Sequence, residues 1–87
     1  MLRLSAQYMA AITLSNEGMS LQKMNQSEKA LSRLSAATFL DQSYFKAHQR
    51  AGQIYYEKQM FSEAEREYAF ASTLCQDQSF AGLVKDC

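Results

Sequence analysis

An all-α fold is predicted by three features of the 87-residue sequence. Apolar residues recur at spacings of three and four along the whole chain, which is the pattern of one helix face. No stretch alternates between apolar and polar residues for long enough to predict a strand. The chain also lacks proline, so that only Gly, Asn, Asp or Ser can mark the ends of its helices. Its length allows one small domain.

The first half of the chain predicts two helices. Apolar positions over residues 4–24 indicate a long first helix, which the polar residues 25–27 end. Gly18 lies inside this helix, where glycine costs about 1 kcal/mol relative to alanine, so we expect a packing reason for it. Ser27 is the expected N-cap of a second helix, whose apolar residues continue to Leu40.

The second half predicts two more helices and the start of a fifth. Apolar spacing indicates a third helix over residues 44–58. The fourth is expected to start after Ser62, which has the Ser-x-x-Glu spacing of a capping box with Glu65. It is expected to end at the polar residues 76–78, and residues 80–84 are expected to begin a short fifth helix.

Composition and charge exclude several classes of protein. Nine basic and nine acidic residues give a formal net charge of zero, which argues against a nucleic-acid-binding protein. The longest uncharged stretch, residues 4–16, is polar in part and too short to cross a bilayer. Two cysteines are too few for a disulfide framework and favour a reducing compartment. With a single histidine the chain offers neither a metal site nor a catalytic constellation, so we expect a cytoplasmic protein that is not an enzyme and needs no cofactor.

An internal repeat of 34 residues relates the two pairs of predicted helices. Most of the superposed residues are small, and they fall where the two helices of a hairpin must approach closely. Sliding the chain by 34 residues superposes Gly18 on Gly52, Ala30 on Ala64, Ala37 on Ala71, Leu40 on Leu74, and Gln42 on Gln76. The predicted organisation is one domain over residues 1–87, with a leading helical segment (1–10), two repeats (11–44 and 45–78) and a capping helix stub (79–87).

A helix-turn-helix repeat of this length and spacing resembles the tetratricopeptide repeat. The second unit matches that pattern through Gly52, Tyr55, Phe61, Ala64, Tyr68 and Ala71, and the first through Leu14, Gly18, Leu21, Ala30, Leu34 and Ala37. It departs from the pattern at His48 (for Trp), Ala51 (for Leu), Gln59 (for Gly) and Gln76 (for Pro). The resemblance implies stacked helix hairpins in a right-handed α-solenoid, about two repeats long with partial helices at either end. It also implies a protein-interaction module, an adaptor or scaffold that binds an extended peptide on its concave face.

A finer resemblance concerns the carboxylate-clamp co-chaperones, whose tetratricopeptide domains bind the acidic C-terminal peptides of heat-shock chaperones. Asn16, Lys46 and Arg50 stand at the spacing of clamp residues in the second and third repeats of those domains. The clamp residues that the first repeat supplies there have no counterpart before residue 11. The resemblance implies that these three residues would bind a C-terminal carboxylate. The residues one turn away would line the same groove, namely Ile12, Met19, Gln49 and Gln53.

The charges at Lys46 and Arg50 allow two interpretations. Residues four apart project from one helix face, and like charges there cost a few tenths of a kcal/mol without a partner anion. A carboxylate would reverse that cost, with Arg50 able to bind two oxygens at once. In the alternative interpretation both are solvated charges, Arg50 is helped by Glu57, and Asn16 has no binding role.

A second candidate function is that of a structural subunit or helper chaperone that docks into a larger assembly. About three repeats are normally needed for a stable array, and the apolar N-terminal helix has no evident polar cap. We therefore expect this end to pack on another chain or on a second copy of the protein. His48, which stands where the repeat has an aromatic residue, is expected to line a hairpin and not to bind a metal.

Overall fold

Residues 5–82 fold into the four main α-helices that the periodicity predicts, but Phe80, the expected first residue of a short fifth helix, is the last residue of the fourth. The computed structural model describes residues 5–82, in which the helices are α1 (Ala6–Lys23), α2 (Ser27–Leu40), α3 (Phe45–Glu57) and α4 (Phe61–Phe80). No strand occurs in this part of the chain, so the predicted all-α class is confirmed. The outer parts of the predicted end segments, residues 1–4 and 83–87, lie outside the described range.

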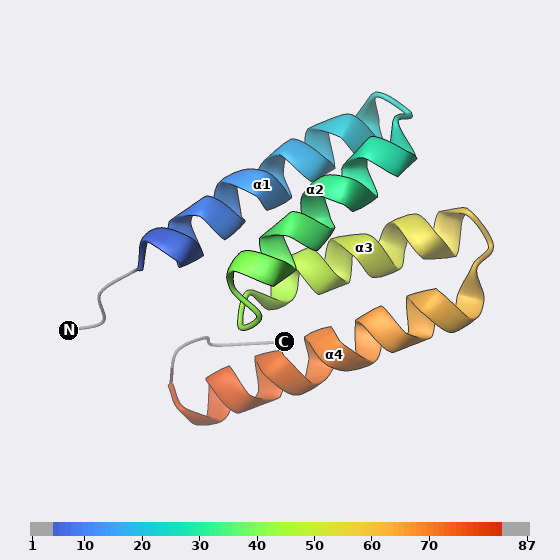
Figure 1. Ribbon diagram of the computed structural model, residues 1–87. Helices are drawn as coiled ribbons and strands as arrows, with labels where there is room; N and C mark the ends of the chain where they lie inside the picture. The colour runs from blue at the N-terminus through green and yellow to red at the C-terminus, as the bar shows by residue number, and fades with distance from the viewer. Residues whose placement is uncertain (1–4, 83–87) are drawn as a thin grey trace.

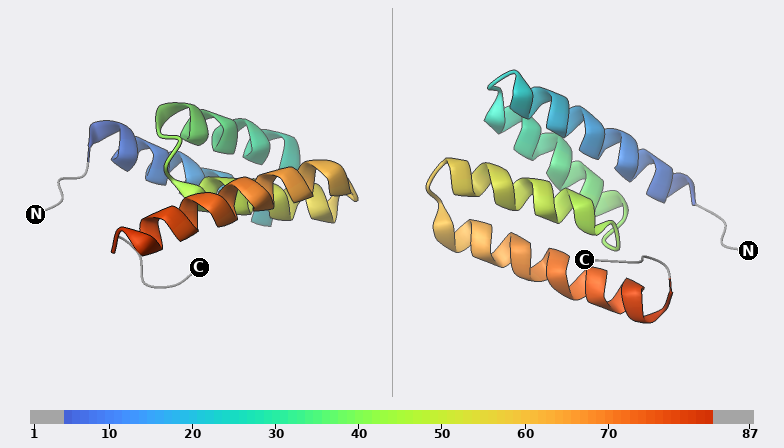
Figure 2. Two further views of the ribbon diagram at one scale, coloured as in Figure 1. Left: turned by 90° about the horizontal axis from the view of Figure 1, so that it is seen from below. Right: turned by 180° about the vertical axis from the view of Figure 1, so that it is seen from behind.

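The helices form two antiparallel hairpins that lie side by side (Figure 1). α1 packs along α2, and α3 packs along α4, while both helices of the first hairpin also contact α3. Seen from behind, the helices follow one another in the order in which they occur in the chain (Figure 2). Within the described helices α2 and α4 do not pack directly against each other, so α3 joins the two hairpins.

The core is built mainly from small residues, which lets the helices approach closely. Leu34 and Ile54 are its largest fully buried apolar side chains, and alanines and Tyr44 complete the cluster. A Cβ atom on Gly18 would lie only 2.9 Å from Leu34 Cγ, and one on Gly52 would lie 3.1 Å from the ring of Tyr68. Close contact between α1 and α2 is therefore the packing reason that we expect for Gly18.

Tyr8 joins the start of α1 to the connection between the two hairpins. Its ring stands edge-on to that of Tyr44, with centroids 5.5 Å apart and planes at 81°. Burial, together with the nearby Tyr44 and Asp41, raises the pKa of the Tyr8 hydroxyl above its usual value. The phenol therefore stays a neutral packing group over a wider pH range.

The starts of α2 and α4 differ from the predicted ones. Gln26 is the N-cap of α2 and Met60 that of α4, and neither helix has a side-chain cap. Ser27 and Ser62 lie inside the helices, so the predicted serine cap and the capping box with Glu65 are both wrong. The physical reason is that a tight turn before each helix sets its first residue, and no side-chain cap is needed to start it.

The end of α4 also differs from the prediction. The helix continues through the polar residues 76–78, where a stop was predicted, as far as Phe80. Gln78 reaches from the helix to the connection between the hairpins, where its Nε2 donates a hydrogen bond of 2.5 Å to the carbonyl of Ser43. Gln78 thus contacts a residue outside its own helix, and residues 76–78 do not end α4. The predicted end of the second repeat, at residue 78, therefore falls inside this helix.

The two hairpins turn in the same way at positions 34 residues apart. Asn25 and Gln59 both adopt the left-handed backbone conformation, with φ of 60° and 62°. In each turn the following residue donates its N–H to a carbonyl five residues earlier, at 2.9 Å in the first turn (Gln26 to Leu21) and 2.8 Å in the second. This hydrogen bond is typical of a Schellman motif, which satisfies the carbonyls at a helix end.

Replacing Gln59 by glycine should stabilise the protein by about 1 kcal/mol, because a left-handed residue with a Cβ costs about 1–2 kcal/mol that glycine avoids. Chemical denaturation followed by circular dichroism measures the change. Gln59→Ala is the matched control, since it shortens the side chain without relieving the backbone and should give no such gain. An equal gain from alanine would show that the side chain, and not the backbone conformation, limits stability there.

Candidate binding site

Arg50 links the two hairpins on the surface between α1 and α3, which we call the α1–α3 surface. Its Nη1 donates a hydrogen bond of 2.5 Å to Ser15 Oγ and one of 3.3 Å to Asn16 Oδ1. Ser15 is fully buried, whereas Asn16 is exposed at the edge of the same helix. The structure therefore brings together two of the three predicted clamp residues, Asn16 and Arg50.

The guanidinium of Arg50 is positioned and still has donors to offer. Within the described residues both of its hydrogen bonds use Nη1, which leaves the N–H groups of Nε and Nη2 for a further acceptor. With Oδ1 of Asn16 facing Arg50, the amide nitrogen of Asn16 is also available to donate. A planar, oriented guanidinium beside a free amide is a suitable partner for a carboxylate.

Lys46 lies one turn before Arg50 on α3, and its side chain is exposed. Ion pairs in the described part of the chain join Arg33 to Glu17 and Lys58 to Glu28, while the Glu67 carboxylate is hydrogen-bonded to His48. Neither Lys46 nor Arg50 has a carboxylate partner among these residues. Glu57, the expected alternative partner of Arg50, accepts a hydrogen bond of 3.2 Å from Gln22 Nε2. The α1–α3 surface therefore carries two adjacent positive charges that no described acidic group neutralises.

The four residues expected to line a groove fall in three different places. Met19 and Gln53 line one shallow pocket of about 450 Å³ between α1 and α3. Gln49 lines another, of about 240 Å³, between α3 and α4. Ile12 is half-buried and packs against the core. Met19 and Gln53 thus extend the surface beside Arg50, whereas Gln49 points to the second hairpin and Ile12 belongs largely to the hydrophobic interior.

The sequence patterns did not identify Ser15, whose Oγ accepts the shorter of the two hydrogen bonds from Arg50. Ser15 lies on the same helix face as Ala11 and Gly18, at spacings of four and three, and all three residues are buried. That spacing identifies Ser15 as an inward-facing residue. A hydroxyl buried on a helix face needs a hydrogen-bonding partner, and this requirement is the signal that could have pointed to a contact with the next hairpin.

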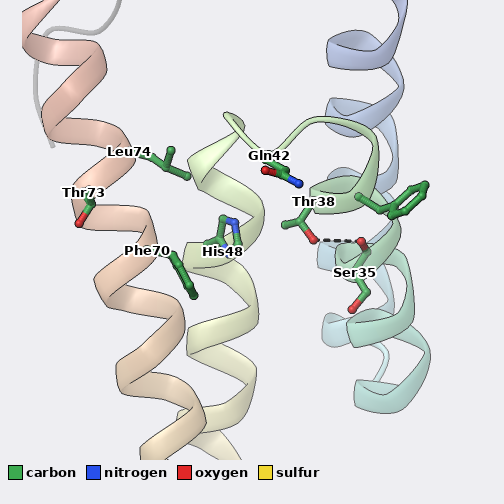
Figure 3. A pocket seen from close by; sticks show the side chains of 8 residues that line it. Ser35, Thr38, Gln42, His48, Phe70, Thr73 and Leu74 are labelled. Carbon is green, nitrogen blue, oxygen red and sulfur yellow. Dashed lines mark hydrogen bonds between the residues drawn. The ribbon is translucent and has the colours of Figure 1, made fainter.

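A larger pocket on another side of α3 was also missed (Figure 3). It has a volume of about 620 Å³ and is lined by Ser35, Thr38, Phe39, Gln42, His48, Phe70, Thr73 and Leu74. We call it the α2–α4 groove, because α2 and α4 form its walls and α3 its floor. His48 Nδ1 lies 2.7 Å from Glu67 Oε2, and its ring centroid is 5.4 Å from that of Phe70. The predicted hairpin-lining role of His48 is confirmed.

Other kinds of site find no basis in the described residues. Among residues 5–82 there is no cluster of three or more His, Cys, Asp or Glu side chains that could hold a metal ion. None of the described helices is both long enough and apolar enough to span a membrane. Cys75 is buried and disulfide-bonded, so it offers no reactive nucleophile. This state does not support the reducing compartment that the number of cysteines favours.

Comparison with known proteins identifies no relative of this chain. No protein-family model matches the chain, and neither a curated protein nor a solved structure matches it.

Proposed function

We propose that this protein is a non-catalytic protein-interaction module of the tetratricopeptide type, which binds an extended peptide along the α1–α3 surface. The observation that carries this proposal is the pair of positive charges at Lys46 and Arg50, with Arg50 held in place by Ser15 and Asn16. A charge-assisted hydrogen bond to a carboxylate would give these groups the partner that the described residues lack.

Equivalent features of the two hairpins support the tetratricopeptide architecture. The left-handed residues Asn25 and Gln59 are 34 positions apart, as are Gly18 and Gly52. The residues that those glycines contact, Leu34 and Tyr68, are also separated by 34 positions. In a right-handed stack of such hairpins the first helices of successive repeats lie side by side on the concave face. In this protein those helices would be α1 and α3.

The ligand that we propose is the acidic C-terminal peptide of a heat-shock chaperone. Its terminal carboxylate would take the free donors of Arg50, and Lys46 would act as a point charge on the same anion. Asn16 would position Arg50 through Oδ1 and donate to the peptide through its amide nitrogen. Met19 and Gln53 would contact the side chains that precede the terminus.

Titration of a peptide ending in Met-Glu-Glu-Val-Asp tests this proposal directly. We expect Lys46→Ala, Arg50→Ala and amidation of the peptide C-terminus each to weaken binding about tenfold or more, since each removes a charged partner worth about 1.5–3 kcal/mol. Lys29→Ala and Arg66→Ala remove the same charges at exposed positions on α2 and α4 and should leave the affinity unchanged. Absence of binding, or binding that is indifferent to amidation, would contradict the proposal.

The second candidate function is that of an assembly subunit that docks through its apolar N-terminal helix. Met9, on the outer side of α1, is 50% exposed, and a chain that docks on this helix would cover it. Met9→Glu should then abolish association with that chain or with a second copy. If Met9→Glu changes neither the size of the protein in solution nor the set of proteins that co-purify with it, docking through α1 is excluded.

A further inference from the structure

The outer face of the second hairpin corresponds to the face of the first hairpin that α3 covers. A pocket of about 240 Å³ on this outer face, which we call the α3–α4 face, is lined by Gln49, Tyr68, Ala71, Ser72 and Cys75. The first three of these residues follow Ser15, Leu34 and Ala37 by 34 positions, and those three are buried in the first hairpin, on which α3 packs. In the described part of the chain no helix follows α4 to cover the α3–α4 face in the same way. This face is therefore the position at which a further element would stack.

A disulfide bond identifies the segment that lies next to this face. Cys75, at the edge of the α3–α4 face, is 3% exposed and disulfide-bonded. The chain contains two cysteines, Cys75 and Cys87. Cys87 lies outside the described residues, and it is the one residue of this chain that can be the partner of Cys75. Since a disulfide holds two Cα atoms within about 7 Å of each other, this pairing ties the last residues of the chain to α4.

The chain after α4 is long enough to return to Cys75. Gly82 follows Cys75 by seven residues, which is about two turns or about 10 Å of helix, and so lies on the same side as Cys75. The φ of Gly82 is 80°, the left-handed conformation with which many helices end and after which the chain takes a new direction. Five residues, 83–87, reach about 16 Å when extended, so they can run back past Ser79 to Cys75.

We propose that residues 83–87 form a strap that closes the end of the α3–α4 face, and that a disulfide between Cys75 and Cys87 holds this strap in place. Leu83 and Val84 supply apolar side chains to the strap, and the disulfide keeps Cys87 at the edge of the pocket. While the strap is closed, no helix can stack on the α3–α4 face as α3 stacks on the first hairpin. The proposal concerns the end of the helix array and does not depend on the peptide site.

The strap opens in response to thiol reductants. Reduction breaks the sulfur–sulfur bond, and Cys75 and Cys87 each take up one electron and one proton, while two molecules of a small thiol such as glutathione are joined as its disulfide. Without the covalent bond the strap is a segment of five residues at a chain end, whose few contacts do not offset the entropy lost on ordering it. The redox state of one bond thus decides whether the α3–α4 face is open.

Mass spectrometry of the full chain, equilibrated in glutathione buffers of increasing reducing strength, tests the pairing. Trypsin cuts after Arg66 and Lys85, so that Cys75 and Cys87 fall in different peptides. In oxidising buffer we expect the monomer to give one cross-linked pair that joins residues 67–85 to residues 86–87, and in reducing buffer we expect this pair to disappear. Closing a loop of about 13 residues should also lower the equilibrium constant for unfolding about a hundredfold, which denaturation with and without reductant measures.

NMR with a neutral, soluble paramagnetic probe tests whether the strap covers the α3–α4 face. Reduction should increase the relaxation that the probe causes at Ala71 and Ser79 at least twofold, because these residues lie one turn on either side of Cys75. Ala37 is the matched control, since it is the equivalent of Ala71 in the first hairpin and should not respond. Cys87→Ser should show the open state without reductant and no further change when reductant is added.

Several outcomes would overturn the proposal. Alkylation of both cysteines in the monomer in oxidising buffer, or a disulfide that joins two copies of the chain, would rule out the pairing. Equal probe effects at Ala71 in the oxidised and reduced protein would mean that the bond covers nothing. An equal rise at Ala37 would indicate general loosening of the helices and not the opening of one face. Reduction of the unsubstituted chain provides this comparison even if Cys87→Ser does not fold.

Discussion

Replacing Leu34 by alanine should lower the free energy of unfolding by about 2–5 kcal/mol. Leu34 is 1% exposed and lies at the centre of the core, in contact with the position of Gly18. Many of its neighbours are alanines, which cannot move into the space that the lost side chain leaves. Because small domains are stable by only about 5–15 kcal/mol, the variant should be substantially unfolded at moderate temperature.

Leu40→Ala is the matched control, since it makes the same chemical change in the same helix at a residue that is 38% exposed. Its cost should be much smaller, because less apolar surface returns to water and no closed cavity forms. Denaturant titrations of both variants, followed by circular dichroism, give the comparison. Equal costs for Leu34→Ala and Leu40→Ala would mean that the core is not centred on Leu34.

Gly18→Ala should destabilise the protein by about 1–3 kcal/mol, although alanine is the better helix former. The new Cβ would lie 2.9 Å from Leu34 Cγ and 3.2 Å from the carbonyl oxygen of Ala30. The first of these atoms is the branch point of a fully buried side chain, and the second belongs to the backbone. Neither can move without displacing α2, so the steric cost exceeds the gain of about 1 kcal/mol in helix propensity.

Gly52→Ala, the equivalent change in the second hairpin, should be neutral or stabilising by up to about 1 kcal/mol. The Cβ there would meet the ring of Tyr68 at 3.1–3.2 Å, but Tyr68 is 40% exposed and its ring can tilt toward solvent. Both variants add one methyl group to a glycine inside a helix, and they differ only in the side chain that faces the new Cβ atom. If both are destabilising by the same amount, the freedom of the facing side chain does not decide the outcome.

A double variant separates the steric cost of Gly18→Ala from other causes. In a Leu34→Ala background the two Leu34 atoms that crowd position 18 are gone, only the carbonyl oxygen of Ala30 remains at 3.2 Å, and the added methyl group fills part of the cavity. Gly18→Ala should then cost much less than it does in the unmodified protein, which gives a strong coupling between the two sites. Additive effects would show that Gly18 is needed for a reason other than its contact with Leu34.

The two surfaces of α3 carry different kinds of chemistry. On one side Arg50 is held by Ser15 and Asn16 beside Lys46, and on the other His48, which is bound to Glu67, forms the floor of the α2–α4 groove.

Local patterns predicted the helices well and their first residues poorly. Apolar spacing placed all four helices, because burial of one face is repeated in every turn. Ser27 and Ser62 carried plausible capping signals, yet the left-handed residues Asn25 and Gln59 set where the next helices begin. Gln59 has no strong preference for that conformation, so the turn depends on the packing of the helices that it connects.

Spacing along the chain was enough to predict the all-α class, the 34-residue relation between the hairpins, and the need for close contact at Gly18. The contact of Arg50 with Ser15, 35 residues away, and the lack of a described carboxylate beside Lys46 became visible only in the folded molecule. The tertiary structure also decided that α2 and α4 diverge and leave an aromatic groove. Such features depend on the angle and distance between hairpins, which arise from the summed packing of many side chains and leave no periodic signal in the sequence.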